Sequence, residues 1–219
     1  MDLMASSTEK PHIRDMQSSA RSRSAYRSAT RPPPRGAHAP APAKAKRAKA
    51  ETFTTPDGRP LSLRAIAPSD AEALRRGFAR LTPEQARLRT FHRIAELSPE
   101  MTERLTNVDP ATTTALVVVD ADGEIRGDAR LHVDATTDSA EFGIAVDPDY
   151  TNQGIGWRLM QRLLEDAKRR GLYELWGDVL AENHTMLDFA KAMGAERHPL
   201  ENEPGVIRVT FRVRDLAKD

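Results

Sequence analysis

Short apolar runs and two-residue alternation along the chain predict the strands of a sheet. Leu61, Leu63 and Ala65 alternate with their neighbours from about Pro60, where we expect ordered structure to begin. Further segments have the apolar content of buried or half-buried strands, and polar turns separate several of them. These segments are residues 113–119, 125–133, 140–146, 175–180 and 206–213.

Apolar positions at helical spacing, bounded by capping residues, predict the helices. Ser69 begins a capping-box pattern ahead of an apolar face, and Thr82 and Ser98 each precede a proline that suits a first helical turn. The longest helix is expected over residues 154–170, ahead of a C-capping glycine, and another over 183–193. Because strands and helices follow one another without strict alternation, we predict an α+β domain with a mixed sheet.

The composition divides the chain into a tail, residues 1–55, and a folded domain, residues 56–219. Residues 1–50 hold 11 Lys and Arg against 3 Asp and Glu, a net charge of +8, and the remainder holds 22 against 29, a net of −7. The tail has too few large apolar side chains to offset the entropy cost of ordering, so we expect it to be disordered. Three interpretations stay open for it: a solvated extension, a contact with nucleic acid or another polyanion, and an organelle transit peptide.

The chain contains no cysteine and no run of 18 apolar residues. The first absence excludes disulfides, thiolate metal sites and a covalent cysteine nucleophile, and the second excludes a membrane-spanning helix. The acidic residues do not have the spacing of a calcium loop, and the histidines have no partners at metal-ligand spacing. We therefore expect a cytoplasmic protein that has no metal and no membrane partner.

A glycine-containing turn within residues 147–160 is the most informative stretch. Gly154 and Gly156 let the backbone approach a ligand closely where an apolar strand meets a long amphipathic helix. Amides at the start of a helix favour a phosphate through their free N–H groups and through the helix dipole. A tight turn without a ligand is the alternative. The stretch lacks the Gly-Lys-Ser/Thr of a P-loop and the three glycines of a dinucleotide-binding fold.

Four segments of the chain resemble a known family. Gln153-Gly154-Ile155-Gly156, after the strand 140–146, resembles the acetyl-CoA-binding motif of the GNAT acetyltransferase superfamily, and residues 179–194 resemble its last helix. Residues 81–91 and 129–134 resemble the catalytic domain of bacterial protein-lysine acetyltransferases that act on acetyl-CoA synthetase. The resemblance implies a GNAT fold, a mixed and mostly antiparallel sheet flanked by helices.

The resemblance also implies that acetyl-CoA is the co-substrate and which residues bind it. Phe142, Ile144 and Val146 would pair with the pantetheine arm, and a backbone amide there would polarise the thioester carbonyl. The resemblance implies that the pyrophosphate is bound by the amides of Gln153, Gly154, Gly156 and Trp157. It also implies that Arg158 adds a positive charge in the first helical turn and that Asn183 both caps its helix and bonds the pantetheine. For the last two, a solvated arginine and a simple cap are the alternatives.

Three positions depart from the superfamily pattern. Thr151 stands where Gln or Arg is usual, and Trp157 stands where a basic or small residue is common. Ala190 takes the place of a Tyr that often acts as general acid, so no acid is carried over.

Glu141 is the candidate general base. Strand alternation places it on one face with Gly143 and Ala145, opposite an apolar face, and an acid is unusual in so apolar a strand. The resemblance places the base of the lysine acetyltransferases at this position. The alternative is an ordinary half-exposed acid on the polar face of the strand.

His132 is a candidate partner of Glu141. If residues 135–138 form the loop of a hairpin, His132 lies opposite Glu141, and directly opposite side chains are close enough to touch. We hypothesise that His132 orients Glu141 or passes its proton to solvent. A partly buried histidine that packs on the sheet is the alternative.

The sequence therefore predicts an acetyl-CoA-dependent N-acetyltransferase whose favoured acceptor is a protein lysine. Because cysteine is absent, we expect direct transfer to the amine without an acyl-enzyme. Two alternatives are a small-molecule amine acetyltransferase on the same fold and a non-catalytic acyl-CoA-binding regulator. Contact with nucleic acid through residues 1–50 is a further alternative role for the chain.

Overall fold

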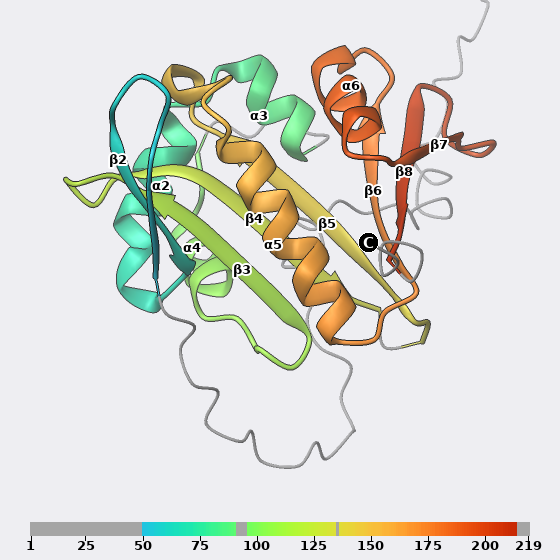
Figure 1. The fold of residues 1–219 in the computed structure, drawn as a ribbon, viewed down its shortest axis with the longest axis horizontal. Coiled ribbons are helices and arrows are strands. Elements are labelled where there is room, and N and C mark those ends of the chain that lie inside the picture. Colours follow the sequence, from blue (N-terminus) through green and yellow to red (C-terminus); the bar gives the residue numbers. More distant parts are fainter. Residues whose placement is uncertain (1–49, 91–95, 135, 214–219) are drawn as a thin grey trace, which may run out of the picture.

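The computed structural model describes residues 50–90, 96–134 and 136–213, which form one eight-stranded sheet covered by helices (Figure 1). The strand order is β1-β2-β3-β4-β5-β6-β8-β7; β5 and β6 run parallel, and the other described pairs are antiparallel. The strands are β1 (Glu51–Thr54), β2 (Pro60–Ala65), β3 (Thr113–Val119), β4 (Ile125–Val133), β5 (Ser139–Val146), β6 (Glu174–Leu180), β7 (Glu196–Pro199) and β8 (Val206–Arg212).

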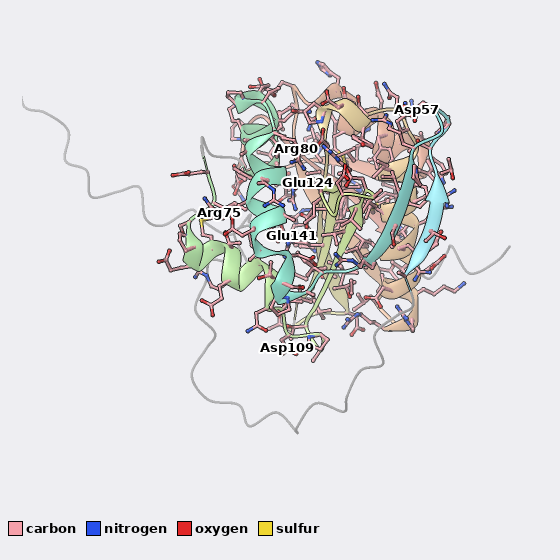
Figure 2. The ribbon with its side chains drawn as sticks, turned by 90° about the vertical axis from the view of Figure 1, so that its left-hand side faces the viewer. Asp57, Arg75, Arg80, Asp109, Glu124 and Glu141 are labelled. Atoms are coloured by element: carbon pink, nitrogen blue, oxygen red, sulfur yellow. The ribbon has the colours of Figure 1, made fainter. Side chains whose placement is uncertain are left out.

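Helices lie on both faces of the sheet, which Figure 2 shows between them. The helices are α2 (Ala71–Ala79), α3 (Pro83–Thr90), α4 (Pro99–Thr106), α5 (Ile155–Arg169) and α6 (His184–Ala192), with short 3₁₀ turns η1 (Pro68–Asp70) and η2 (Pro148–Tyr150). On one face, Leu74 and Phe78 of α2 and Leu105 of α4 pack in a cluster with Val117 and Val119 of β3. The other face carries α5.

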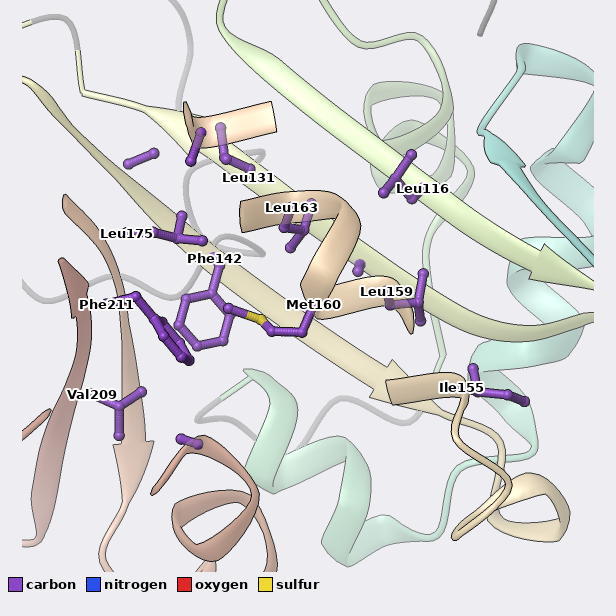
Figure 3. Close-up of a cluster of buried hydrophobic side chains, with 14 of the residues drawn as sticks. Leu116, Leu131, Phe142, Ile155, Leu159, Met160, Leu163, Leu175, Val209 and Phe211 are labelled. Carbon is purple, nitrogen blue, oxygen red and sulfur yellow. The ribbon is translucent and has the colours of Figure 1, made fainter. Parts of the chain in front are cut away.

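The larger core lies between α5 and the sheet (Figure 3). Ile155, Leu159 and Leu163 recur at helical spacing on α5 and are almost fully buried, each burial contributing about 1.5–3 kcal/mol. Ile155 and Leu159 can approach the sheet closely because β4 has a glycine, Gly127, at this point: a Cβ there would lie 2.8 Å from Ile155 Cγ2 and 3.0 Å from Leu159 Cδ1. Close contact between α5 and β4 fixes where the first turn of α5 stands relative to β5.

Most predicted elements are confirmed. Strands β3 and β4 have the predicted bounds, and the predicted mixed, mostly antiparallel sheet flanked by helices is present. The predicted start near Pro60 is wrong, because β1 forms at Glu51–Thr54 and pairs with β2. Strand β7 was not predicted, since its four residues are all exposed and carry no apolar pattern.

The predicted helix start at Ser69 needs correction. Ser69 lies inside the turn η1, and α2 begins at Ala71. The polar anchor of this turn is Asp70, whose carboxylate accepts a hydrogen bond from the amide of Ala67 at 2.8 Å and pairs with Arg64 at 2.7 Å.

The predictions for the N-terminal tail and for a membrane-spanning helix can be compared with the structure only in part. The tail was predicted to be disordered over residues 1–55, and β1 contradicts this for Glu51–Thr54 because it pairs with β2. Residues 1–49, which hold nearly all of the segment proposed for nucleic-acid contact or transit, lie outside the described residues. Among the described residues, no helix is both long and apolar enough to span a membrane.

Candidate active site

The site is built where two parallel strands separate. β5 and β6 pair over only three residues each, with Ser139, Ala140 and Glu141 opposite Glu174, Leu175 and Trp176. Beyond this short ladder β5 continues to Val146 and β6 to Leu180, and Figure 1 shows the two strands diverging. The facing backbone edges of β5 and β6 are therefore free to bond another extended chain.

The N-terminus of α5 closes one end of this gap. Gly154 is the N-cap, with a φ of 77° that an L side chain adopts only with strain. The first helical bond runs from the amide of Arg158 to the carbonyl of Gly154 at 3.1 Å, so the amides of Ile155, Gly156 and Trp157 precede the helical ladder. These amides, together with the helix dipole, favour an anion.

Two adjoining cavities follow the gap between β5 and β6. One has a volume of about 440 Å³ and the other about 590 Å³, within the usual range for a small-molecule site. Most of the predicted coenzyme residues line one or both: Phe142, Ile144, Val146, Gly154, Gly156, Trp157 and Asn183. The structure thus brings together residues that are more than 40 positions apart in the sequence.

Glu141 lies at the vertex of the gap and is buried, with 5% of its surface exposed. It points to the α3 side of the sheet, because its neighbour Phe142 packs in the α5 core. The alternative of a half-exposed acid is therefore wrong. Trp176 is its partner on β6, and Arg208 stacks on the Trp176 ring at 3.8 Å.

Charges on the neighbouring strands surround Glu141. Burial alone would lower the pKa of Arg208, but its hydrogen bonds to Asp178 and the negative charges of Asp178 and Glu141 raise it above the usual value. Arg208 pairs with Asp178 at 2.8 Å, and Asp178 also lines the cavity of about 440 Å³ together with Gly143. Glu141 therefore lies in the field of a permanently charged guanidinium.

His132 lies directly opposite Glu141 in the β4–β5 ladder, as the hairpin register predicted. Asp134 likewise faces Ser139, whose carbonyl accepts the amide of Asp134 at 3.0 Å. The ring Nδ1 of His132 shares a hydrogen bond with Thr113 Oγ1 at 2.9 Å. Burial lowers the pKa of His132 below its ordinary 6.5, and the charge of Asp134 offsets this only in part.

The remaining predicted residues take different places. Asn183 caps α6, its side chain accepting from the amide of Met186 at 3.1 Å, and it also lines both cavities. Arg158 pairs with Glu51 at 3.2 Å and stacks on Phe53 at 4.5 Å, so β1 competes with any phosphate for it. Gln153 has its side-chain oxygen buried and contributes its backbone to the turn.

Several residues of the cleft were not predicted. Arg89 of α3 reaches Gly143, and Thr185 and Met186 line both cavities from the start of α6. Arg89 stands in a helix with a mixed and mainly polar sequence, where an arginine ordinarily indicates a solvated face. A glycine at position 143 in the middle of a strand was the one available signal, because it often marks a close approach.

Residues 77–195 match the family model described as Acetyltransferase (GNAT) family. Acetyltransferase PA5475 of Pseudomonas aeruginosa is 30% identical over 160 residues, which cover 71% of this chain and 86% of that protein. The ribosomal protein bS18-alanine N-acetyltransferase of Escherichia coli is 40% identical over 53 residues, which cover 24% of this chain and 36% of that protein.

Solved structures share the fold. The GNAT domain of S. lividans PAT superposes with a TM-score of 0.69 at 24% identity, over 74% of this chain and 96% of that chain. A cAMP-binding acyltransferase from Mycobacterium smegmatis superposes with a TM-score of 0.52 at 24% identity, over 75% of this chain and 47% of that chain.

Proposed function

The chain belongs to the GNAT acetyltransferase family, and we propose that it transfers acetyl from acetyl-CoA directly to the amine of a protein lysine. The observation that carries the proposal is a buried acid, Glu141, at the vertex of a cleft whose other end is a helix N-terminus suited to an anion. The distance between these two ends is the length of one short strand, which suits an extended phosphorylated coenzyme.

The coenzyme fits the described residues. The free edge of β5 from Phe142 to Val146 offers amide and carbonyl groups to the pantetheine arm, and an amide there would polarise the thioester carbonyl. The amides from Gln153 to Trp157 would hold the pyrophosphate, with Asn183 beside the arm. Acetyl-CoA supplies the activated acyl group, and no metal is needed for this transfer.

Glu141 would act as the general base. A free lysine amine, with a pKa of about 10.4, is neutral in only about 1 part in 2,500 at pH 7, which costs roughly 4.6 kcal/mol. A carboxylate that takes the proton as the nitrogen attacks removes much of this cost. Its burial keeps water away, and the negative charge of Glu141 contributes to the raised pKa of Arg208, so that a permanent positive charge lies close to the carboxylate.

A protein amine is the favoured acceptor. The folded part carries an excess of acidic residues, which suits a lysine-bearing partner. The relatives include a ribosomal-protein alanine N-acetyltransferase and the GNAT domain of a protein called PAT. A small-molecule amine acceptor is the second candidate, and the open cleft of about 440 Å³ is the observation that favours it.

The test is thiol release from acetyl-CoA by wild type and Glu141→Gln, with lysine peptides, acetyl-CoA synthetase and small amines as acceptors. We expect Glu141→Gln to lower kcat by about 10²–10⁴-fold with little change in the KM for acetyl-CoA. Glu165→Gln, an exposed acid paired with Arg162 on α5, is the matched control and should leave kcat unchanged. A kcat for Glu141→Gln within threefold of wild type would contradict the base. Binding of acetyl-CoA without turnover on any amine would favour the alternative of a non-catalytic acyl-CoA-binding regulator.

A further inference from the structure

Arg89 is a buried cation inside the cleft. It stands on α3 with 8% of its surface exposed, and its guanidinium lies against β5 at Gly143. A Cβ on Gly143 would lie 2.9 Å from Cζ of Arg89, so the absent side chain at Gly143 makes room for the guanidinium. Gly143 is two residues from Glu141 and points to the same side of the sheet.

The guanidinium is held in place from the side away from the cleft. Arg89 pairs with Asp128 at 3.5 Å, and Asp128, itself 6% exposed, pairs with Arg130 at 3.0 Å. Arg130 in turn donates to the carbonyl of Leu105 at 2.7 Å. Because Asp128 lies on β4 opposite Ala145, the pair ties α3 to two strands, and Arg89 forms a fixed part of the wall.

Arg89 also lies beside a third cavity, which is smaller than the two that form the cleft. This cavity of about 30 Å³ lies between α2 and the sheet and is lined by Leu74, Phe78 and Ile125 among others. The residues that it shares with the cleft are Leu81, Arg89, Ala145 and Val146. The side chain of Arg89 is therefore one of those that lie between the cleft and this cavity.

The wall that Arg89 forms lies where the acyl end of the coenzyme is expected. This placement rests on the proposed function. The amides of the α5 N-terminus follow β5 directly, and Val146 lies four residues, or about 13 Å of strand, from Phe142. A pantetheine arm that runs back along β5 from those amides carries its thioester toward Gly143 and Glu141. The acyl group then meets Arg89.

We propose that Arg89 is the residue that restricts this enzyme to short acyl groups: its guanidinium blocks the space that an acyl chain longer than acetyl would enter. An extra methylene in a closed pocket typically changes kcat/KM by about 10–200-fold. Wild type should therefore prefer acetyl-CoA over butyryl-CoA by at least about tenfold, and shortening Arg89 should open the wall into the smaller cavity.

The test compares acetyl-, propionyl-, butyryl- and succinyl-CoA on wild type, Arg89→Ala and Leu81→Ala, both as kcat/KM and as Kd. We expect Arg89→Ala to raise kcat/KM for butyryl-CoA in absolute terms and to narrow the acetyl-to-butyryl ratio at least about tenfold. Leu81→Ala removes part of the same wall without changing a charge, and should shift the ratio in the same direction by a smaller factor. Arg87→Ala is the control, since Arg87 pairs with Glu84 and Glu182 on the outside of α3.

Arg89→Ala should fold, because Asp128 keeps Arg130 as its partner. A purely structural role would lower turnover of all acyl-CoAs alike, and an unchanged acetyl-to-butyryl ratio would overturn the proposal. A wild-type preference for succinyl-CoA that Arg89→Ala removes would also overturn it, in favour of carboxylate recognition. If wild type turns over no acyl-CoA, the proposed function fails. The role of Arg89 is then tested by the ratio of the Kd values for acetyl-CoA and butyryl-CoA in wild type and Arg89→Ala.

Discussion

His132 and Glu141 face each other across the β4–β5 ladder, where Glu141 is buried and His132 is half-buried. His132 is held by Thr113 on the strand to one side, so its ring cannot turn freely. Its lowered pKa keeps it neutral at pH 7, and a neutral imidazole can accept a proton from a carboxylic acid.

Substituting His132 tests whether it relays the proton of Glu141. The acid limb of the wild-type pH–rate profile should contain a step below the ordinary histidine pKa of 6.5, because burial lowers the pKa of His132. His132→Phe should remove this step and lower kcat on the order of tenfold. His198→Phe, at an exposed histidine on β7, should keep the wild-type profile. An identical profile for His132→Phe would show that this histidine only packs on the sheet.

At the scale of elements, the turn into α5 sets both the anion site and the stability of the helix start. Gly154 and Gly156 have different structural roles in this turn. Gly154 has a positive φ and open space around it, whereas a Cβ on Gly156 would contact Phe189 and Ile144 at 3.8–3.9 Å. The first glycine is favoured by the backbone conformation, whereas a methyl group at the second would fit the fold but occupy part of the cavity.

Two alanine variants should distinguish the roles of Gly154 and Gly156. Gly154→Ala should lower the free energy of unfolding by about 1–2 kcal/mol, the cost of a left-handed L residue. Gly156→Ala should raise it by up to about 1 kcal/mol through better helix propensity, yet weaken acetyl-CoA binding because the new methyl group narrows the cavity. Urea unfolding measures the free energy of unfolding of each variant, and calorimetry measures its Kd for acetyl-CoA. Equal effects of the two substitutions on stability would contradict this assignment.

The sequence was a good guide where periodicity is strong and a poor one where it is absent. Strands β3 and β4 were predicted with their bounds because their apolar runs end in turn residues. The edge strands β1 and β7 have only four residues each and no apolar run, and β7 is fully exposed. The register of His132 against Glu141 followed from the length of the hairpin loop. Arg89 was missed because its burial depends on α3 folding over Gly143, a contact between distant segments that no local pattern encodes.

At the scale of the whole molecule, one buried carboxylate connects the α2 layer to the turn before α5. Asp147 accepts from Arg80 at 2.7 Å and from Arg126 at 3.0 Å, and it also accepts the amide of Asp149 (Figure 2 labels Arg80). Burial alone would raise the pKa of Asp147, but these hydrogen bonds outweigh it and lower the pKa below 3.8. The fold is therefore stabilised by the ionised form.

This network predicts how stability depends on pH. Because the pKa of Asp147 is lowered on folding, its contribution is fully present above the ordinary value of 3.8 and is lost as the pH falls through the lowered one. Asp147→Asn should reduce the free energy of unfolding by about 1–3 kcal/mol at pH 7, and the difference from wild type should shrink below pH 3.8. Urea unfolding at a series of pH values measures this, with Asp149→Asn as control. A difference that does not change with pH would contradict the linkage.

The three-residue ladder between β5 and β6 gives this protein two sheet edges in its interior. An exposed edge invites any passing strand to pair with it, which is why proteins shield their edges. Here α3 and α6 stand over the gap, as the lining of the cleft shows, so a second polypeptide strand with its side chains meets steric obstruction. A thinner extended chain that carries amides can still bond to these edges within the cleft of about 440 Å³. We therefore expect the cleft to favour a slender extended ligand over a polypeptide strand.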